Sequence, residues 1–294
     1  MEEKASFSEE KNKILGGVLY LVATPIGNLS DLSARAEKTL REVDFIAAED
    51  TRNSQRLLLH LGIRKELVSY FEHNKRQRGE QILARLLGGE SCALITDAGT
   101  PAISDPGEDL VRLCGDAGVP VTSVPGCCAA VNALALSGLP TGRFIFEGFL
   151  PVPKGERRER IAALQGETRT VILYEAPHRL RETLGELYGS LGDRPISLCR
   201  ELTKLNEEIL RTTLSGAIAV YEEKDPRGEY VLILGGAENA GISKEKAALL
   251  ALSPEEHVQH YEEAGLSRMD AIKAAAKDRG VPKNEIYKLV NQKN

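Results

Sequence analysis

The chain lacks the features of several large protein classes. Its 294 residues contain no apolar run near the roughly 18 residues that a membrane-spanning helix needs. Residues 1–13 are polar and charged and have no signal-peptide core, so we expect a disordered extension there. With 42% hydrophobic residues the remainder can bury substantial cores. We therefore expect a soluble, cytoplasmic protein without membrane contact.

Metal ligands and disulfide patterns are also missing. The five cysteines stand at positions 92, 114, 127, 128 and 199, an odd number without zinc-ligand spacing. Such a set suits reduced thiols in the cytosol better than a disulfide framework. His257 and His260 stand on a helix-like stretch without a cysteine, and we expect no metal site there.

The usual nucleotide motifs are absent, and the net charge is −5. No GxGxxG follows the first predicted strand and no GxxxxGK[ST] occurs, which disfavours a dinucleotide fold and a phosphate-cradling loop. A general nucleic-acid binder is usually basic. A local cluster of Lys154, Arg157 and Arg158 could still contact a polyanion, although a solvated helix face is the favoured interpretation when nothing else points to a polyanion.

What is present is an alternation of strands and helices typical of an α/β fold. In the first half we predict strands at 18–23, 45–49, 67–71, 92–96 and 119–124, and helices at 31–42, 51–61, 77–87, 107–117 and 128–137. After a break at Gly138 to Gly142 we predict strands at 144–149, 170–175, 196–200 and 230–234, and helices at 156–164 and 177–191. We therefore expect an N-terminal α/β domain over 14–140 and a smaller one over 141–238.

Residues 239–294 carry helix signals only. Ser253 with Glu256, and Ser267 with Asp270, have capping-box spacing. Gly265 and Gly280 are stop signals, and Pro282 can open a third helix. This pattern resembles a helix-turn-helix, and equally a small bundle that packs on a neighbour.

Three loops rich in small residues follow predicted strands. They are residues 23–28 (ATPIGN), 97–107 (DAGTPAISDPG) and 124–129 (VPGCCA). Because parallel strands end at one edge of a sheet, the three loops can line one pocket there. An ordinary set of tight turns is the alternative.

These loops belong to a set of five ordered motifs: LYLVATPIGNLSDLSARA, AAEDTR, LITDAGTPAISDPG, VPG and LYEAPHRL. Together they resemble the ribosomal RNA small-subunit methyltransferase I family, within the tetrapyrrole-methylase-like fold. The resemblance runs from Leu15 onward over nearly all of the chain.

The resemblance implies two α/β domains with S-adenosylmethionine in the cleft between them, followed by the small helical unit. It also implies a homodimer that methylates a cytidine ribose 2′-hydroxyl in 16S ribosomal RNA of the small subunit, near the decoding centre. Two alternatives stay open, a tetrapyrrole methyltransferase and a non-catalytic RNA-binding assembly factor. The first loop reads VATPIGN rather than the VGxGPGD expected of a tetrapyrrole enzyme.

The resemblance also places the donor site on individual residues. The matching positions for cofactor binding are Pro25, Ile26, Ala98, Gly99, Thr100, Ile103, Cys128, Ala129, Tyr174 and Leu202. The chain departs from the family's small or hydroxyl residues at Cys127 and Cys128, where a backbone contact can survive but a hydroxyl contact cannot. For Ile26 and Tyr174, burial in a core is the alternative interpretation.

Carboxylates at two strand ends are candidates for the chemistry. Methyl transfer to a ribose hydroxyl needs alignment and assistance with proton loss. Glu49, Asp50 and Arg52 follow one predicted strand and Asp97 follows another. Asp50 could instead be a helix N-cap and Asp97 a turn cap, while Arg52 suits a substrate phosphate.

A second polar group lies in LYEAPHRL. His178 could act as a base near neutrality, although a surface or capping role is the more common one for a lone histidine there. Arg179 opens the same helix. We expect the RNA to contact Asn28, Asp31, Arg52, Lys154, Arg157, Arg158 and Arg179.

Overall fold

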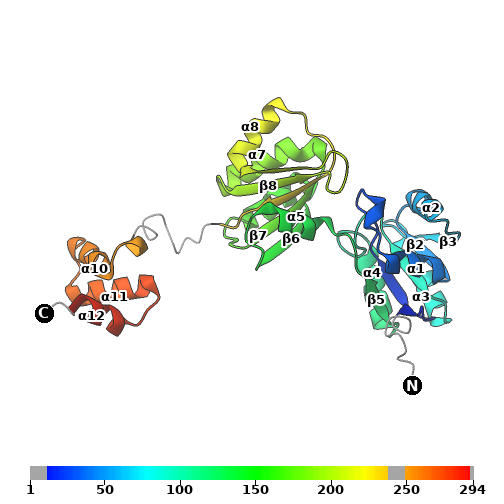
Figure 1. Ribbon diagram of the computed structural model, residues 1–294, viewed down its shortest axis with the longest axis horizontal. Coiled ribbons are helices and arrows are strands. Elements are labelled where there is room, and N and C mark those ends of the chain that lie inside the picture. The colour runs from blue at the N-terminus through cyan, green and yellow to red at the C-terminus, as the bar shows by residue number, and fades with distance from the viewer. Residues whose placement is uncertain (1–11, 238–248, 292–294) are drawn as a thin grey trace, which may run out of the picture. The chain divides into compact units, whose positions relative to one another are not determined.

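The computed structural model describes residues 12–237 and 249–291, and Figure 1 shows its ribbon. The chain divides into two compact units, of which one contains two five-stranded sheets and the other the C-terminal helices. The disorder expected for residues 1–13 falls almost wholly outside the described residues. None of the helices in the described ranges has the length and apolar character needed to cross a bilayer.

The first sheet is wholly parallel, with strand order β3-β2-β4-β1-β5. Its strands are β1 (Leu19–Val22), β2 (Phe45–Ala48), β3 (Glu66–Ser69), β4 (Cys92–Ile95) and β5 (Val121–Val124). The connecting helices are α1 (Ala34–Glu42), α2 (Thr51–His60), α3 (Lys75–Leu87) and α4 (Gly107–Asp116). In place of the helix predicted at 31–42, the chain forms a short 3-10 turn (Leu29–Asp31) and then α1.

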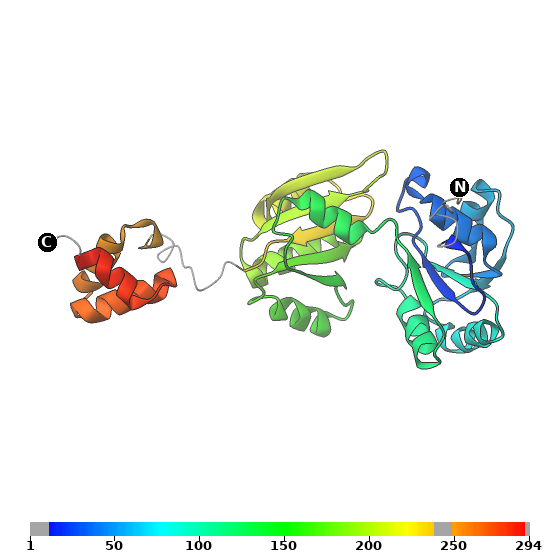
Figure 2. The same ribbon diagram turned by 60° about the horizontal axis from the view of Figure 1, so that its bottom comes forward.

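Both faces of this sheet are covered, which explains why its central strands β1, β2 and β4 are entirely apolar, whereas the edge strands β3 and β5 carry polar residues. Successive side chains of a strand point to opposite faces. Tyr20 and Val22 therefore pack in the cluster that includes α1 and α2, whereas Leu19 packs in the cluster that includes α3 and α4. Figure 2 shows helices on both sides of these strands.

The second sheet is mixed, with strand order β6-β7-β10-β8-β9. Its strands are β6 (Phe144–Phe149), β7 (Thr170–Glu175), β8 (Pro195–Arg200), β9 (Glu208–Thr213) and β10 (Tyr230–Leu234), with helices α6 (Lys154–Ala163), α7 (Leu180–Leu191) and α8 (Leu214–Glu223). Only the β6–β7 pair is parallel. It has as many strands as the first sheet, whereas the sequence predicted only four of them. Strand β9 and helix α8 were not predicted.

Helix α5 (Ala129–Ser137) connects the two sheets. Although it follows the last strand of the first sheet, Ala130, Ala133 and Leu134 pack on the second sheet with Val231 and Ile233. The other residues of β10 face the opposite side, where α6, α7 and α8 form a separate core. The second sheet thus owes one of its covering layers to a helix that precedes the predicted domain boundary.

The second unit contains α10 (Pro254–Glu263), α11 (Arg268–Arg279) and α12 (Lys283–Asn291). Ser253 and Glu256 form the predicted capping box, and Ser267 caps α11. Gly280 ends α11 in the left-handed conformation. Val258, Ala271 and Ile286 belong to the shared apolar core of these helices.

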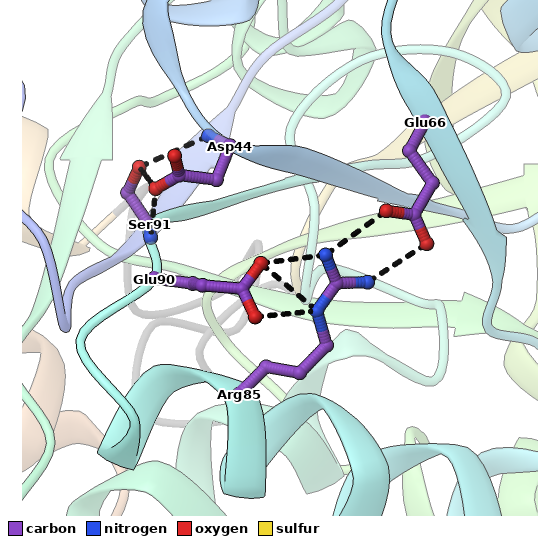
Figure 3. A network of polar contacts seen from close by, with 5 residues as sticks. All are labelled: Asp44, Glu66, Arg85, Glu90 and Ser91. Carbon is purple, nitrogen blue, oxygen red and sulfur yellow. Dashed lines mark hydrogen bonds and ion pairs between the residues drawn. The ribbon is translucent and has the colours of Figure 1, made fainter.

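An arginine in α3 binds carboxylates on the edge strand β3 and just before β4 of the first sheet (Figure 3). Arg85 donates to both carboxylate oxygens of Glu66 on β3, at 2.8 and 3.0 Å, and to Glu90 just before β4. Its guanidinium carbon lies 3.6 Å from the ring centroid of the buried Phe45. The hydrogen bonds from Arg85, together with its charge, hold the pKa of Glu66 below its usual range.

We predict that Arg85→Gln lowers the free energy of unfolding at pH 7 by about 1 to 2 kcal/mol, because it removes two ion pairs and a cation–π contact. Because folding lowers the pKa of Glu66, the ionised carboxylate contributes to the free energy of unfolding at neutral pH. This contribution is lost as the pH falls below the ordinary pKa of 4.5. Urea unfolding at pH 7 and pH 3 should therefore show a smaller difference at pH 3. Arg78→Gln, on the exposed face of α3, is the control.

Candidate functional site

The first sheet has a topological switch point between β1 and β4. From β1 the chain crosses through α1 to β2 on one side, whereas from β4 it crosses through α4 to β5 on the other. Ligands of open α/β sheets bind at the carboxyl ends of the strands at such a point. The two loops that leave β1 and β4 are the ones predicted from the sequence to meet a ligand.

A pair of backbone hydrogen bonds joins these two loops. Thr24 N donates to Gly99 O at 2.9 Å and Gly99 N donates to Thr24 O at 3.0 Å. The hydroxyl of Thr24 also donates to the carbonyl of Thr96, at 3.2 Å. Gly99 has φ +87°, which L side chains rarely adopt. The third loop joins the same set, because the hydroxyl of Thr100 donates to Cys127 O at 2.9 Å.

The loop after β4 holds two residues other than glycine in the left-handed region. Ala102 and Ser104 both have φ 66°. Asp105 supports this conformation, since its Oδ1 accepts from Ala102 N at 2.9 Å and from Gly107 N at 2.7 Å. Its Oδ2 is buried and accepts from no described residue. Unfavourable backbone conformations and unpaired buried atoms of this kind are concentrated at ligand sites.

A cavity of about 470 Å³ opens beside these loops. Side chains from both sheets line it, and Tyr174 of β7 contacts Phe146 and Phe149 edge-on with ring centroids 5.2 and 5.5 Å apart. Burial raises the pKa of Tyr174 to about 12, so its phenol is neutral at physiological pH. The cavity is lined by Ile26, Glu49, Thr96, Asp97, Ala98, Ile103, Ser104, Asp105, Ala129, Phe149, Tyr174, Glu175, Ala176, Pro177, Cys199, Glu201, Leu202, Lys204, Glu229, Tyr230 and Val231.

Three carboxylates on the first-sheet side of this cavity form no ion pair with a described residue. Glu49 accepts from the hydroxyl of Thr96 at 2.8 Å. Asp97 accepts from the backbone N–H of Asp50 at 3.3 Å and from the amide of Asn53 at 3.2 Å. Asp105 is the third, and burial raises its pKa. This wall therefore favours a cationic ligand.

The turn after β8 supplies a lysine on the opposite wall. Lys204 Nζ donates to Glu201 and to Glu229, both at 2.9 Å. A Cβ on Gly27 would lie 2.3 Å from Lys204 Cγ. Any other residue at this position of the first loop would therefore clash with the lysine side chain as it is placed. Glu201 and Thr203 adopt left-handed φ values of 51° and 66°.

Many of the residues predicted from the sequence come together here. The cavity lining includes Ile26, Glu49, Asp97, Ala98, Ile103, Ala129, Tyr174 and Leu202. The other predicted cofactor residues, Pro25, Gly99, Thr100 and Cys128, are not part of that lining, but Gly99 and Thr100 hold the loops together. Asp105, Lys204 and Glu229 also line the cavity and were not predicted from the sequence. Only Asp105 carried a signal, its place in the SDPG sequence.

Asp50 and Arg52 differ from the roles expected for them. Asp50 is the N-cap of α2, where its side chain accepts from Arg52 N, and it also forms an ion pair with the Arg52 guanidinium at 2.8 Å. These hydrogen bonds lower the pKa of Asp50 to about 2, so its carboxylate is a poor proton acceptor. The structure thus shows the N-cap alternative for Asp50, and its catalytic role stays a prediction. The Arg52 side chain remains 87% exposed.

One further prediction from the sequence needs correction. Arg157 is only 3% exposed, because its guanidinium bonds Glu186 and Thr183 inside the protein. It is therefore not available to RNA. His178 lies in a short 3-10 turn (Pro177–Arg179), is exposed and is not part of the cavity lining, so its catalytic role stays a prediction.

The remaining predicted RNA residues lie outside the cavity lining. Lys154 and Arg158 are exposed on α6. Arg179 is partly buried and donates to the carbonyl oxygens of Leu150 and Pro151. The other two, Asn28 and Asp31, are exposed at the short turn before α1, which Asn28 caps.

We predict that Asp105→Asn stabilises the protein at pH 7 by roughly 1 kcal/mol, because it removes a partly buried charge and keeps one acceptor oxygen. Burial raises the pKa of Asp105 in the folded protein, so the ionised carboxylate lowers the free energy of unfolding, and more so as the pH rises. This destabilisation disappears below the ordinary pKa of 3.8, where the carboxyl is protonated in both states. Urea unfolding should show a gain at pH 7 and none at pH 3. The exposed Asp116→Asn is the control, and an equal gain there would contradict the account.

Comparisons with known proteins agree with this geometry. Residues 18–218 match the family model of the tetrapyrrole (corrin/porphyrin) methylases. The crystal structure of uroporphyrin-III-C-methyltransferase from Thermus thermophilus superposes with a TM-score of 0.54 at 20% identity, over 78% of this chain and 98% of that one. That likeness shows the fold alone, and it confirms the predicted fold class.

Two curated relatives are similar over nearly their whole length. The ribosomal RNA small subunit methyltransferase I of Halalkalibacterium halodurans is 47% identical over 292 residues, which are 99% of this chain and 100% of the relative. The protein of the same name from Bacillus subtilis is 46% identical over 92% of this chain and 93% of the relative. This chain therefore belongs to the ribosomal RNA small subunit methyltransferase I family, within the tetrapyrrole methylases.

Proposed function

We propose that this chain uses S-adenosylmethionine to methylate 16S ribosomal RNA in the small ribosomal subunit. The observation that supports this proposal is the near full-length similarity to ribosomal RNA small subunit methyltransferase I, combined with a cavity lined by residues of the shared motifs. As the finer proposal, the methyl group goes to the ribose 2′-hydroxyl of a cytidine near the decoding centre. The family membership supports this choice.

The residues of the cavity fit S-adenosylmethionine. Its volume of about 470 Å³ lies within the range of small-molecule sites. Ile26, Ile103 and Leu202 offer apolar surface for an adenosyl group, and the unpaired Asp105 Oδ2 offers a buried acceptor. The carboxylates of the first-sheet wall suit a positively charged sulfonium.

When bound, the cofactor supplies a methyl group on a good leaving group, so no protein nucleophile is required. The protein's part is to align the ribose hydroxyl and to accept its proton. Glu49 and Asp97 are the proposed acceptors, because both line the cavity and neither forms an ion pair with a described residue. The hydroxyl of Thr96 bonds Glu49 Oε2 and thereby orients this carboxylate.

The RNA side of the proposal rests on exposed polar residues. Arg52 lies one turn from the cavity-lining Glu49, and its guanidinium can bind phosphate on its exposed edge. Asn28 and Asp31 are proposed to face the substrate from the first loop. Lys154, Arg158 and the partly exposed Arg179 are proposed as contacts on the second sheet's side.

The experiment that tests this function is incubation with labelled S-adenosylmethionine and either 30S subunits or a porphyrinogen. We expect label in the 16S RNA only, and ribose mapping should locate it at one cytidine. Ile103→Asp should abolish both labelling and donor binding by calorimetry, because it places a fourth unpaired carboxylate in the cavity, against the adenosyl group. Ile103→Val is the matched control and should keep both. Labelled porphyrinogen without labelled RNA would contradict the proposal.

We further propose that the protein acts as a homodimer in the cytoplasm. The edge strand β6 supports the first part, because Phe144 and Phe146 are 44% and 36% exposed there. Sedimentation equilibrium should give a mass of twice the 32.0 kDa of one chain. A single species of 32.0 kDa at micromolar concentration would contradict the dimer.

A further inference from the structure

Residues 51–65 form a basic surface on a chain whose net charge is −5. The segment covers α2 and the turn after it, and it contains Arg52, Arg56, Arg64 and Lys65 but no aspartate or glutamate. In α2, Arg52, Arg56 and His60 are spaced four residues apart, so they follow one another along one side of the helix. All three are exposed.

The charges of this surface are largely uncompensated. Arg56, Arg64 and Lys65 form no ion pair with a described residue. Of the carboxylates near this segment, Asp50 pairs with Arg52, Glu66 is bound by Arg85 through both oxygens, and Asp44 is bound by Ser91 (Figure 3). Hydrogen bonds from Ser91 lower the pKa of Asp44, with a smaller contribution from the charge of Lys65, which does not pair with it. Cations left free in this way are available to phosphate groups.

A hollow of about 220 Å³ lies beside the basic stripe, between α2 and β3. Its apolar residues include Ile63 and Leu59, and Leu59 is 65% exposed. Gln55, Arg64 and Lys65 complete its lining. An apolar surface beside a guanidinium and an amide is the kind of site on which an unstacked RNA base can pack and form hydrogen bonds.

The basic surface begins at the proposed active site. Asp97, which lines the cavity, accepts hydrogen bonds from the backbone of Asp50 and from Asn53 in the first turn of α2. The side chains of Arg52 and Arg56 therefore extend from the rim of the cavity along the helix. A strand of RNA with one nucleotide at the cavity could continue along this stripe.

We propose that residues 51–65 bind the RNA strand next to the target nucleotide, with phosphates on the α2 stripe and one unstacked base in the hollow at Leu59. This inference rests on the proposed function, because it takes RNA as the substrate. It assigns roles to Arg56, Arg64, Lys65 and Leu59, which are separate from the cofactor cavity.

The test measures binding to 30S subunits between 50 and 200 mM KCl, and donor binding by calorimetry. The variant Arg56→Gln/Arg64→Gln/Lys65→Gln should bind 30S subunits at least about tenfold more weakly. The slope of log binding constant against log salt concentration should become smaller by roughly 2, because each lost phosphate contact removes about 0.7 to 1 from it. Donor affinity should not change. Leu59→Ala should weaken binding severalfold while keeping the wild-type slope.

The matched control is Lys38→Gln/Arg78→Gln/Arg112→Gln, which removes the same charge from α1, α3 and α4, where each side chain already has a carboxylate or amide partner. It should bind like the wild type. Equal effects of the two triple variants, or no effect of the first, would overturn the assignment while leaving the methylation proposal standing. An unchanged affinity in Leu59→Ala would overturn the role of the hollow. Absence of 30S binding by the wild type would instead refute the proposed function.

Discussion

The site depends on the two backbone hydrogen bonds between Thr24 and Gly99. They join the loops that leave β1 and β4, at the point where the connections of the sheet diverge. The pairing is made with Gly99 at φ +87°, a conformation that glycine adopts without strain. Thr100 extends the constraint to the third loop through Cys127 O. The two hydrogen bonds between Thr24 and Gly99 thus fix the loops that form the first-sheet wall of the cavity.

The other wall is held by burial rather than by backbone pairing. Helix α5 follows directly on the third loop and packs its small side chains, such as Ala130 and Ala133, on β10 and its neighbours. Ile26 from the first loop and Tyr174 from β7 pack against the same cluster. The chain therefore covers one face of the second sheet with segments that emerge from the first. The cavity lining therefore combines strained loop backbone with apolar side chains of a core cluster.

The sequence predicted the parts of this arrangement that depend on local pattern. Apolar strands followed by loops of small residues identified the cavity edge, including Glu49 and Asp97. Long-range packing was not predictable in this way: the helical pattern of α5 does not show which sheet it covers, and a run such as KGERRER does not show that Arg157 turns inward to Glu186. Lys204 and Glu229 come from segments far from any motif, so only the fold brings them to the cavity.

The central claim is that the loops tied by Thr24 and Gly99, together with Tyr174, enclose the methyl donor. A crystal structure with bound S-adenosylhomocysteine tests it most directly. The account predicts the ligand between Ile103 and Tyr174, with Asp105 within hydrogen-bonding distance. A ligand bound away from residues 97–107 would contradict it.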